Sequence, residues 1–429
     1  MDELGTISRG RPARRGVLAA AAALLALGAA PAVAAAPRRM RLRLPAPSGP
    51  YPVGRVALRL VDRSRRDPWT ADPARELMVD VRYPARSVAG HGRAPQMTAR
   101  EAAGFDRLNN FEGLPAGRVD WAATRTFAHT AAPLDPRAAH PVVLYSPGVV
   151  DPRSLGTTLT DDLASRGYVV IAIDHPYDVS AVEFPGGRVA VSRLPQEFGE
   201  AQRSGPAAVT ALLKKTAGVR VADACFVLDV VQRAFDTHRL RRAPIGMFGQ
   251  SAGGFAALQT LHDDERLAAA ANLDGVLAYV QDDHDEGGLS TVAAEGVDRP
   301  VLLMGSEGID RRTVPSWREL WRHSGGWRRD LTLRGSRHAT YTDATTLLPQ
   351  IAARLDLPHE TLTTWVGSVP TERAVAAQRA YLAAFFDRWL RGGGRALQEA
   401  PDPREPGNGV NLSRGPQRYL RPKRNHPTC

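Results

Sequence analysis

Cysteine is scarce in this chain, which excludes a fold that depends on a framework of disulfide bonds. Among 429 residues only Cys225 and Cys429 are cysteines, too few for the cross-linked scaffolds of small secreted domains. Cys225 falls on the apolar side of an expected helix, so we expect a buried, inert thiol. The sequence leaves open whether the two cysteines pair, because pairing depends on geometry.

Concentrated positive charge is also lacking, although the formal net charge is +11. The arginines are scattered, without aromatic interleaving or a compact basic run, which argues against nucleic acid as a partner. A solvated Arg-rich surface accounts for the charge, which would also favour transient contact with an anionic membrane surface. No pattern indicates an oligomeric state.

Motifs for metals and phosphate groups are missing as well. The chain has no phosphate-binding glycine loop and no His/Cys cluster with zinc spacing. The acidic stretch Gln281–Glu286 is bounded by glycines. Calcium needs about six to eight oxygens converging from fixed positions, so we expect a solvated loop there. The sequence therefore implies no cofactor and no metal.

The first residues have the pattern of an export signal. A positive stretch ending in Arg14-Arg15 precedes the apolar segment Gly16–Ala36, and Ala32-Val33-Ala34 offers the small residues that signal peptidase accepts. We expect a signal peptide over 1–34, a linker over 35–52, and secretion. The twin-arginine and general export routes both stay open. A membrane anchor is disfavoured, because Gly and Pro interrupt the segment and a span needs ~20 strongly apolar residues.

Hydrophobic periodicity predicts one α/β catalytic domain over residues 53–394. Val53–Asp62 and Glu76–Tyr83 alternate apolar with polar residues, which predicts an antiparallel hairpin. Short continuous apolar runs, typical of strands buried on both faces, follow at Pro141–Ser146, Tyr168–Asp174, Pro244–Gly249, Ala270–Asp274, Pro300–Gly305 and Leu331–Leu333. Helical patterns lie between several of them, so we expect a mostly parallel sheet with helices on both faces.

The remaining segments complete this outline. We expect helices at Gly156–Arg166, at Val221–Phe235 and, closing the domain, over Val375–Trp389. A surface hairpin is expected at Val182–Val191, and loop with short helices over Ser87–Arg137. Residues 395–429 are rich in Pro and Arg and are expected to form a flexible tail.

The segment Pro244–Gly254 predicts a nucleophilic serine. It reads as a strand, a sharp turn and a helix around Gly249-Gln250-Ser251-Ala252-Gly253, the chain's only match to G-x-S-x-G. Glycines flanking the turn allow strand and helix to crowd together, so the turn can hold Ser251 in a strained conformation with an exposed hydroxyl. This context predicts the α/β-hydrolase fold, with Ser251 as nucleophile.

A serine nucleophile needs a neighbouring base oriented by a carboxylate, in the chain order Ser, acid, His. His338 follows the expected last strand in a Gly-Ser loop, whereas His323 falls on a helix and His359 and His426 lie too far beyond that strand. For the acid, Asp274 follows one strand, and Asp310 or Glu307 follows the next. Position alone does not choose among these three carboxylates.

Two backbone amides are expected to form an oxyanion hole. One is the N–H of Ala252, directly after the nucleophile, and the other comes from the loop after the first central strand. That loop reads Ser146-Pro147-Gly148-Val149, in which Gly148 permits close approach and Val149 is the expected donor.

These segments resemble the platelet-activating-factor acetylhydrolase family of α/β-hydrolases, which also holds bacterial secreted lipases and esterases. The likeness runs from about Val53 to Gly394 and rests on Leu60-Val61-Asp62, Arg66–Trp69, Val81–Pro84, Tyr145–Gly148, Asp162–Tyr168, Gly249–Gly254, Leu273–Gly275 and Gly335–His338. It implies that the acid is Asp274. Pro147 and Gln250 stand where the family often has histidine, which leaves the triad intact and bears on substrate preference.

The sequence thus predicts a secreted serine ester hydrolase acting on a small-molecule or lipid ester, and the resemblance implies short-acyl or acetyl-phospholipid esters. A lipase or polyester hydrolase and a serine peptidase on the same fold are the alternatives. A non-catalytic binding protein is a further one, disfavoured because every triad residue is present. Acyl preference depends on loops such as Ser87–Arg137 and Gly275–Asp298, so the substrate itself is not encoded in a motif.

Overall fold

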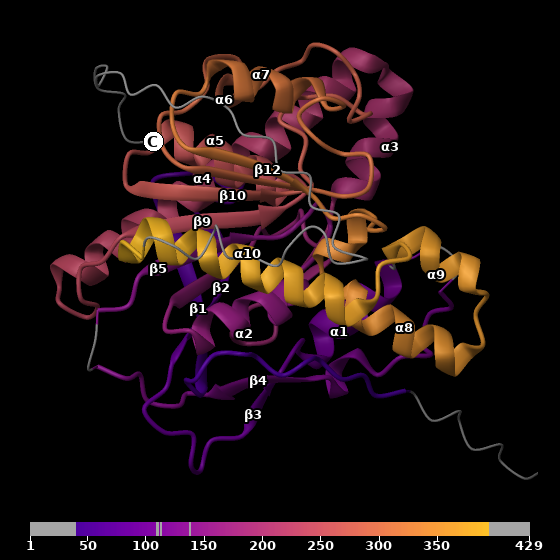
Figure 1. Ribbon diagram of the computed structural model, residues 1–429. Coiled ribbons are helices and arrows are strands. Elements are labelled where there is room, and N and C mark those ends of the chain that lie inside the picture. Colours follow the sequence, from indigo (N-terminus) through magenta and orange to yellow (C-terminus); the bar gives the residue numbers. More distant parts are fainter. Residues whose placement is uncertain (1–39, 109–110, 112–113, 137–138, 394–429) are drawn as a thin grey trace, which may run out of the picture. The chain divides into compact units, whose positions relative to one another are not determined.

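A ten-stranded mixed sheet forms the centre of the computed structural model, which describes residues 40–108, 111, 114–136 and 139–393 (Figure 1). All described residues fall within one compact unit. The strands, in spatial order, are β12 (Arg328–Thr332), β11 (Val301–Gly305), β10 (Leu267–Leu273), β9 (Ile245–Gln250), β5 (Val142–Ser146), β6 (Val169–Asp174), β2 (Arg75–Pro84), β1 (Val53–Asp62), β4 (Arg125–Thr130) and β3 (Arg93–Pro95).

The strands from β12 to β6 run parallel, and β2 pairs antiparallel with both β6 and β1. The mostly parallel sheet and the first hairpin are therefore confirmed. A separate two-stranded sheet of β7 (Ala181–Glu183) and β8 (Val189–Val191) forms the expected surface hairpin. The helices are α1 (Ala99–Leu108), α2 (Thr157–Ser165), α3 (Leu194–Ser204), α4 (Pro206–Asp236), α5 (Ala252–Asp263), α6 (Thr291–Glu295), α7 (Pro315–His323), α8 (Ala344–Leu355), α9 (His359–Val366) and α10 (Thr371–Arg391).

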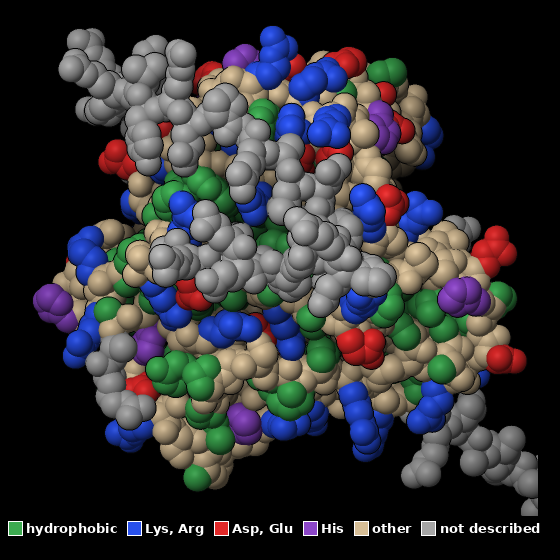
Figure 2. Space-filling model, viewed as in Figure 1, with side chains coloured by type: hydrophobic (Ala, Val, Ile, Leu, Met, Phe, Trp, Pro, Cys, Tyr) green, Lys and Arg blue, Asp and Glu red, His purple; other side chains and the backbone are tan. Residues whose placement is uncertain are grey.

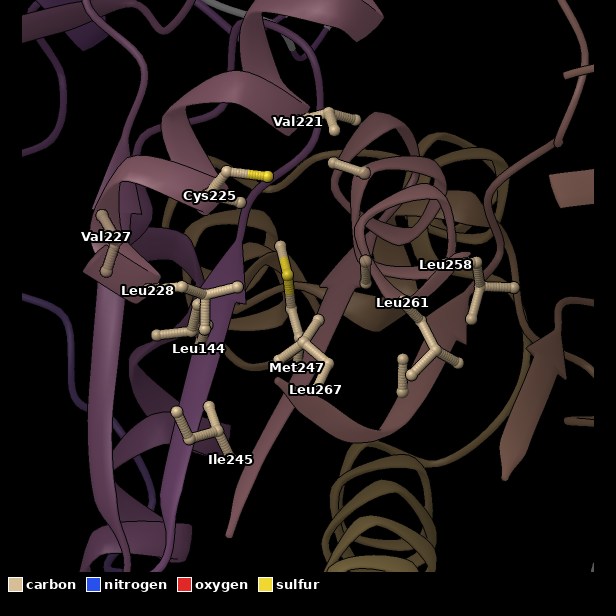
Figure 3. Packing of buried hydrophobic residues seen from close by; sticks show 14 of the residues in the cluster. Leu144, Val221, Cys225, Val227, Leu228, Ile245, Met247, Leu258, Leu261 and Leu267 are labelled. Atoms are coloured by element: carbon tan, nitrogen blue, oxygen red, sulfur yellow. The ribbon is translucent and has the colours of Figure 1, made fainter. Parts of the chain in front are cut away.

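Helices cover both faces of the parallel part of the sheet. Successive residues of a strand point to opposite faces, so neighbouring residues enter different cores. Leu144 and Met247 belong to the core shared with α4 to α7 (Figure 3), whereas Tyr145 and Phe248 pack towards α2 and α10. The rings of Tyr145 and Phe248 lie 4.8 Å apart between centroids. Continuous apolar runs are therefore needed in these strands, since both faces are buried.

Three segments differ from the sequence-based expectation. Residues 87–137 contain the edge strands β3 and β4 and the helix α1 rather than mainly loop. Helix α4 begins at Pro206, well before the expected Val221. Residues 40–52 do not form a free linker, because Leu42 and Leu44 are buried in a core that includes α1 and α8. Short or weakly periodic segments such as these are fixed by tertiary packing.

The thiol expectation for Cys225 is wrong. Its side chain is buried on α4, as expected (Figure 3), but Cys225 is disulfide-bonded, and no cysteine among the described residues is free. Cys429, the other cysteine of the sequence, lies outside the described residues, as do the expected signal peptide and tail.

The surface of the described region carries its charge in mixed form. Lys and Arg side chains are interspersed with Asp and Glu on the face shown in Figure 2. Within the described part of the chain, no helix combines the length and apolarity that a membrane span requires.

The close approach of α5 to the end of β5 supplies a stability test. A methyl group on Gly253 would overlap the backbone of Ser146 and Pro147, whereas one on Gly218, an exposed position of α4, would meet none of the described atoms. Gly253→Ala should lower the free energy of unfolding by about 1–3 kcal/mol or more, since an overpacked core must shift. Gly218→Ala should raise it by up to about 1 kcal/mol, because Ala is the better helix former.

Urea unfolding of both variants beside the wild type measures these changes. Equal stability of Gly253→Ala and the wild type would show that the strand and helix do not need this close approach.

Candidate active site

Ser251 occupies the turn between β9 and α5, in a backbone conformation that few residues other than glycine adopt. Its φ is 55° and its ψ is −125°. The turn is anchored because the Ser251 amide donates a hydrogen bond of 2.9 Å to the carbonyl of Leu273 on the neighbouring strand β10. Such strain persists only where the surroundings over-determine the backbone, and it is a recurring feature of functional turns.

Asp274 follows β10 directly and also has a positive φ, 59°. Its side chain is almost fully buried at 3% exposure. One carboxylate oxygen accepts a hydrogen bond of 2.6 Å from the Ser306 amide, and the other lies 2.7 Å from Nδ1 of His338. A buried carboxylate requires such partners, because desolvation without them is costly.

The two alternative acids, Asp310 and Glu307, accept hydrogen bonds from groups other than His338. Asp310 accepts from the amides of Arg312 and Thr313 within its own turn, and Glu307 accepts from the amide of Gly335. The structure therefore brings Asp274, rather than Asp310 or Glu307, to the imidazole of His338.

His338 begins the short helical turn His338–Tyr341 that follows β12, and 52% of its side chain is exposed. Desolvation lowers the pKa of His338, but the hydrogen bond and charge of Asp274 outweigh that effect, and the pKa is raised above its ordinary value. The other histidines weighed lie elsewhere: His323 ends α7 and His359 starts α9. His426 lies outside the described residues.

Gln250 contacts the imidazole, a contact that the sequence analysis missed. Its Nε2 lies 3.0 Å from Nε2 of His338, while its Oε1 is buried and has no partner among the described residues. Because Nδ1–H of His338 faces Asp274, Nε2 accepts from the amide of Gln250. Within the described residues the Ser251 hydroxyl makes no hydrogen bond to this nitrogen, so the amide must give way before the serine can. The position of Gln250 directly before Ser251 was the one sequence signal that could have pointed to this contact.

The loop after β5 passes over the serine. A methyl group on Gly148 would lie 3.4 Å from Cβ of Ser251 and would overlap Oε1 of Gln250, so a side chain there would require the Gln250 side chain to move. Val149 follows in this loop, and Ala252 is the first residue of α5, where an amide has no partner within the helix. Ala252 therefore presents a helix-start amide directly after Ser251, and Val149 as the second donor stays a prediction.

Two further acidic residues contribute to the field at His338. Asp283 and Asp151 both favour the charged imidazole, after the larger effect of Asp274. Burial raises the pKa of Asp283. Asp283 belongs to the acidic stretch Gln281–Glu286, whose other residues are exposed as expected, apart from this half-buried side chain. The run of acidic residues in the sequence does not by itself indicate that Asp283 acts on His338.

The matched family and relatives are named as acetylhydrolases or esterases. Residues 38–184 match the family described as platelet-activating factor acetylhydrolase, isoform II. A probable 1-alkyl-2-acetylglycerophosphocholine esterase of Arthroderma benhamiae is 28% identical over 85% of this chain and 92% of its own length. The platelet-activating factor acetylhydrolase of Cavia porcellus is 22% identical over about half of each chain, 50% and 51%.

A solved structure extends the comparison over the whole fold. The ferulic acid esterase of Streptomyces cinnamoneus is 32% identical, covers 87% of this chain and 99% of its own, and superposes with a TM-score of 0.64.

The coupling between Asp274 and His338 can be measured directly. Asp274→Asn removes the charge that raises the pKa of His338, so the imidazole should titrate at a lower pH than in the wild type. Asp310→Asn removes a charge from the same edge of the sheet without a contact to His338, and should leave the titration in place. NMR titration of the imidazole protons measures both; an unchanged pKa in Asp274→Asn would contradict the assigned contact.

Proposed function

The chain belongs to the platelet-activating-factor acetylhydrolase-like esterases of the α/β-hydrolase superfamily, and on that premise we propose that it hydrolyses short-acyl esters, acetylated phospholipids among them, through an acyl-enzyme on Ser251. It is a carboxylic ester hydrolase. The observation that carries the proposal is the 2.7 Å contact between His338 and the buried Asp274 beside the strained turn of Ser251.

In the proposed reaction, Oγ of Ser251 attacks the carbonyl carbon of the ester while Nε2 of His338 takes the hydroxyl proton. The amides of Val149 and Ala252 hold the negative oxygen of the tetrahedral intermediate. His338 then gives the proton to the departing alcohol, which leaves the acyl group on Ser251. Water attacks this ester in the same manner, and the free acid and the serine are restored.

Asp274 holds Nδ1–H of the imidazole, which directs the basic Nε2 to the serine and stabilises the imidazolium that forms. The raised pKa of His338 has a consequence for this role. A base must be neutral to accept a proton, so activity should fall as the pH drops through a value above the ordinary pKa of histidine.

Ser251→Ala should abolish turnover, with a loss in kcat of up to about a million-fold, because no other group replaces the nucleophile. A fluorophosphonate probe should label the wild type and not the variant. Equal labelling of the variant would show that another residue is the nucleophile. Gly218→Ala serves as a folded control with unchanged activity.

The acyl preference is tested with a chain-length series of aryl esters beside an acetylated phospholipid. We expect kcat/KM to be highest for acetyl to butyryl esters, in keeping with the family and with the acetyl ester named for the Arthroderma relative. A rate that climbs steadily to acyl chains of about twelve carbons would instead indicate a lipase, whose pocket accepts a longer apolar chain.

We also propose that the protein is exported, on the basis of the leader pattern in residues 1–34. The N-terminal sequence of protein recovered from culture medium should begin near Ala35. An intact leader in a membrane fraction would favour an anchor.

A further inference from the structure

An arginine lies fully buried beneath the loop that carries the proposed oxyanion donor. Arg220 of α4 is 0% exposed, and its guanidinium donates to the carbonyl of Pro147 at 2.5 Å and to that of Gly148 at 2.9 Å. Asp178 holds the same guanidinium through two hydrogen bonds, 2.7 Å to Nε and 2.6 Å to Nη2. This two-point pairing fixes the plane of the guanidinium, because its donors form a rigid fork.

The same pair holds the next part of the loop. Val150 has a φ of 67°, a strained value for a β-branched residue. Its amide donates to Oδ1 of Asp178 at 3.4 Å, and its carbonyl accepts from Ser180 at 2.7 Å. The strain of such a residue persists only where the surroundings enforce it. The Arg220–Asp178 pair thus binds both sides of Val149.

The direction of the Val149 amide follows from these contacts. In a trans peptide the C=O of one residue and the N–H of the next lie in one plane and point in opposite directions. With the Gly148 carbonyl directed at Arg220, the Val149 N–H points away from Arg220. Gly148 itself abuts the serine, since a Cβ built on it would lie 3.4 Å from Cβ of Ser251, and among the described residues no acceptor is bonded to the Val149 N–H.

We propose that the Arg220–Asp178 pair is the positioning element of the oxyanion site: by binding the Pro147 and Gly148 carbonyls from beneath, it directs the Val149 N–H to the reacting carbonyl oxygen. Arg220 touches no reacting atom and acts through the loop. The inference rests on the proposed function, because only an oxyanion at Ser251 requires that donor.

A second buried set of side chains holds the start of the loop. Oγ of Ser146 lies 2.9 Å from Nε2 of His175, whose Nδ1 lies 3.0 Å from Asp223. All three side chains are 0% exposed. Ser146, His175 and Asp223 are the residue types of a catalytic triad, but no substrate reaches a fully buried serine. Its effect is to fix the end of β5, from which the loop departs.

The test compares Arg220→Lys with Arg55→Lys. Lysine keeps the charge in the buried pair but lacks the fork that binds two carbonyls and a carboxylate together. Arg55 is the matched control, since it is buried, donates to Asp80 at 2.8 and 2.7 Å, and contacts no residue of the 146–150 loop among the described contacts. Both variants are assayed as full-length protein on an acetyl aryl ester and on its thionoester, in which sulfur replaces the carbonyl oxygen.

Loss of one oxyanion donor costs about 10²–10³ in kcat. We therefore expect Arg220→Lys to lower kcat for the oxygen ester by about a hundredfold with KM changed less than about threefold, because the donor acts in the transition state. The thionoester should lose far less, since sulfur accepts only weak hydrogen bonds. Arg55→Lys should leave the ratio of the two rates unchanged.

An Arg220→Lys enzyme with wild-type kcat, or with equal losses on both esters, would overturn the inference and leave the esterase assignment standing. Failure of the assignment itself would appear as an inactive wild type or an active Ser251→Ala. If Arg220→Lys does not fold, as judged by circular dichroism, Asp178→Asn answers the same question. That change keeps the shape of the side chain and weakens its hydrogen bonds to Arg220. The ratio of kcat on the oxygen ester to kcat on the thionoester must therefore again fall.

Discussion

The turn between β9 and α5 can close only because Gly249 and Gly253 lack side chains, and the candidate site depends on that closure. A methyl group on Gly249 would overlap the backbone of α5 at Gly253, and one on Gly253 would overlap the backbone of Ser146 and Pro147 at the end of β5. The close approach forces Ser251 to a φ of 55° and brings its amide to the carbonyl of Leu273, one residue before Asp274. The serine and the carboxylate are therefore positioned by neighbouring strands of one rigid sheet.

Opposing electrostatic demands meet at this edge of the sheet. Asp274, Asp283 and Asp151 favour a charged imidazole at His338, while the N-terminus of α5 favours negative charge at the serine. In the proposed mechanism, a tetrahedral intermediate beside an imidazolium satisfies both demands. In the arrangement that the structure shows, the Ser251 hydroxyl is not bonded to Nε2 of His338, because the amide of Gln250 occupies that nitrogen. Formation of the Ser251–His338 contact thus requires a rotation of one buried side chain, that of Gln250.

The parts of this architecture encoded by local patterns were predictable. Buried parallel strands, the strand-turn-helix around Ser251 and the loop of His338 each have their signal within a dozen residues, and the structure has each of them, although β12 runs over Arg328–Thr332 where the sequence predicts Leu331–Leu333. Position left the acid open among three carboxylates, and the contact that favours Asp274 joins it to His338, 64 positions away. Arg220 meets Pro147 across 73 positions, and Gln250 meets His338 across 88. Such contacts depend on side-chain packing, as do the short edge strands β3 and β4, so no local pattern announces them.

Detection of an acyl group bound covalently to Ser251 tests the central claim, an acyl-enzyme mechanism, most directly. Wild-type protein mixed with an excess of an acetyl aryl ester and quenched in acid within the first turnovers should carry the mass of one acetyl group. Tandem mass spectrometry of the tryptic peptide Ala243–Arg266, which contains Ser251, should locate that group on the serine oxygen. Turnover with no acyl adduct, or with the adduct on any other residue, would contradict the account.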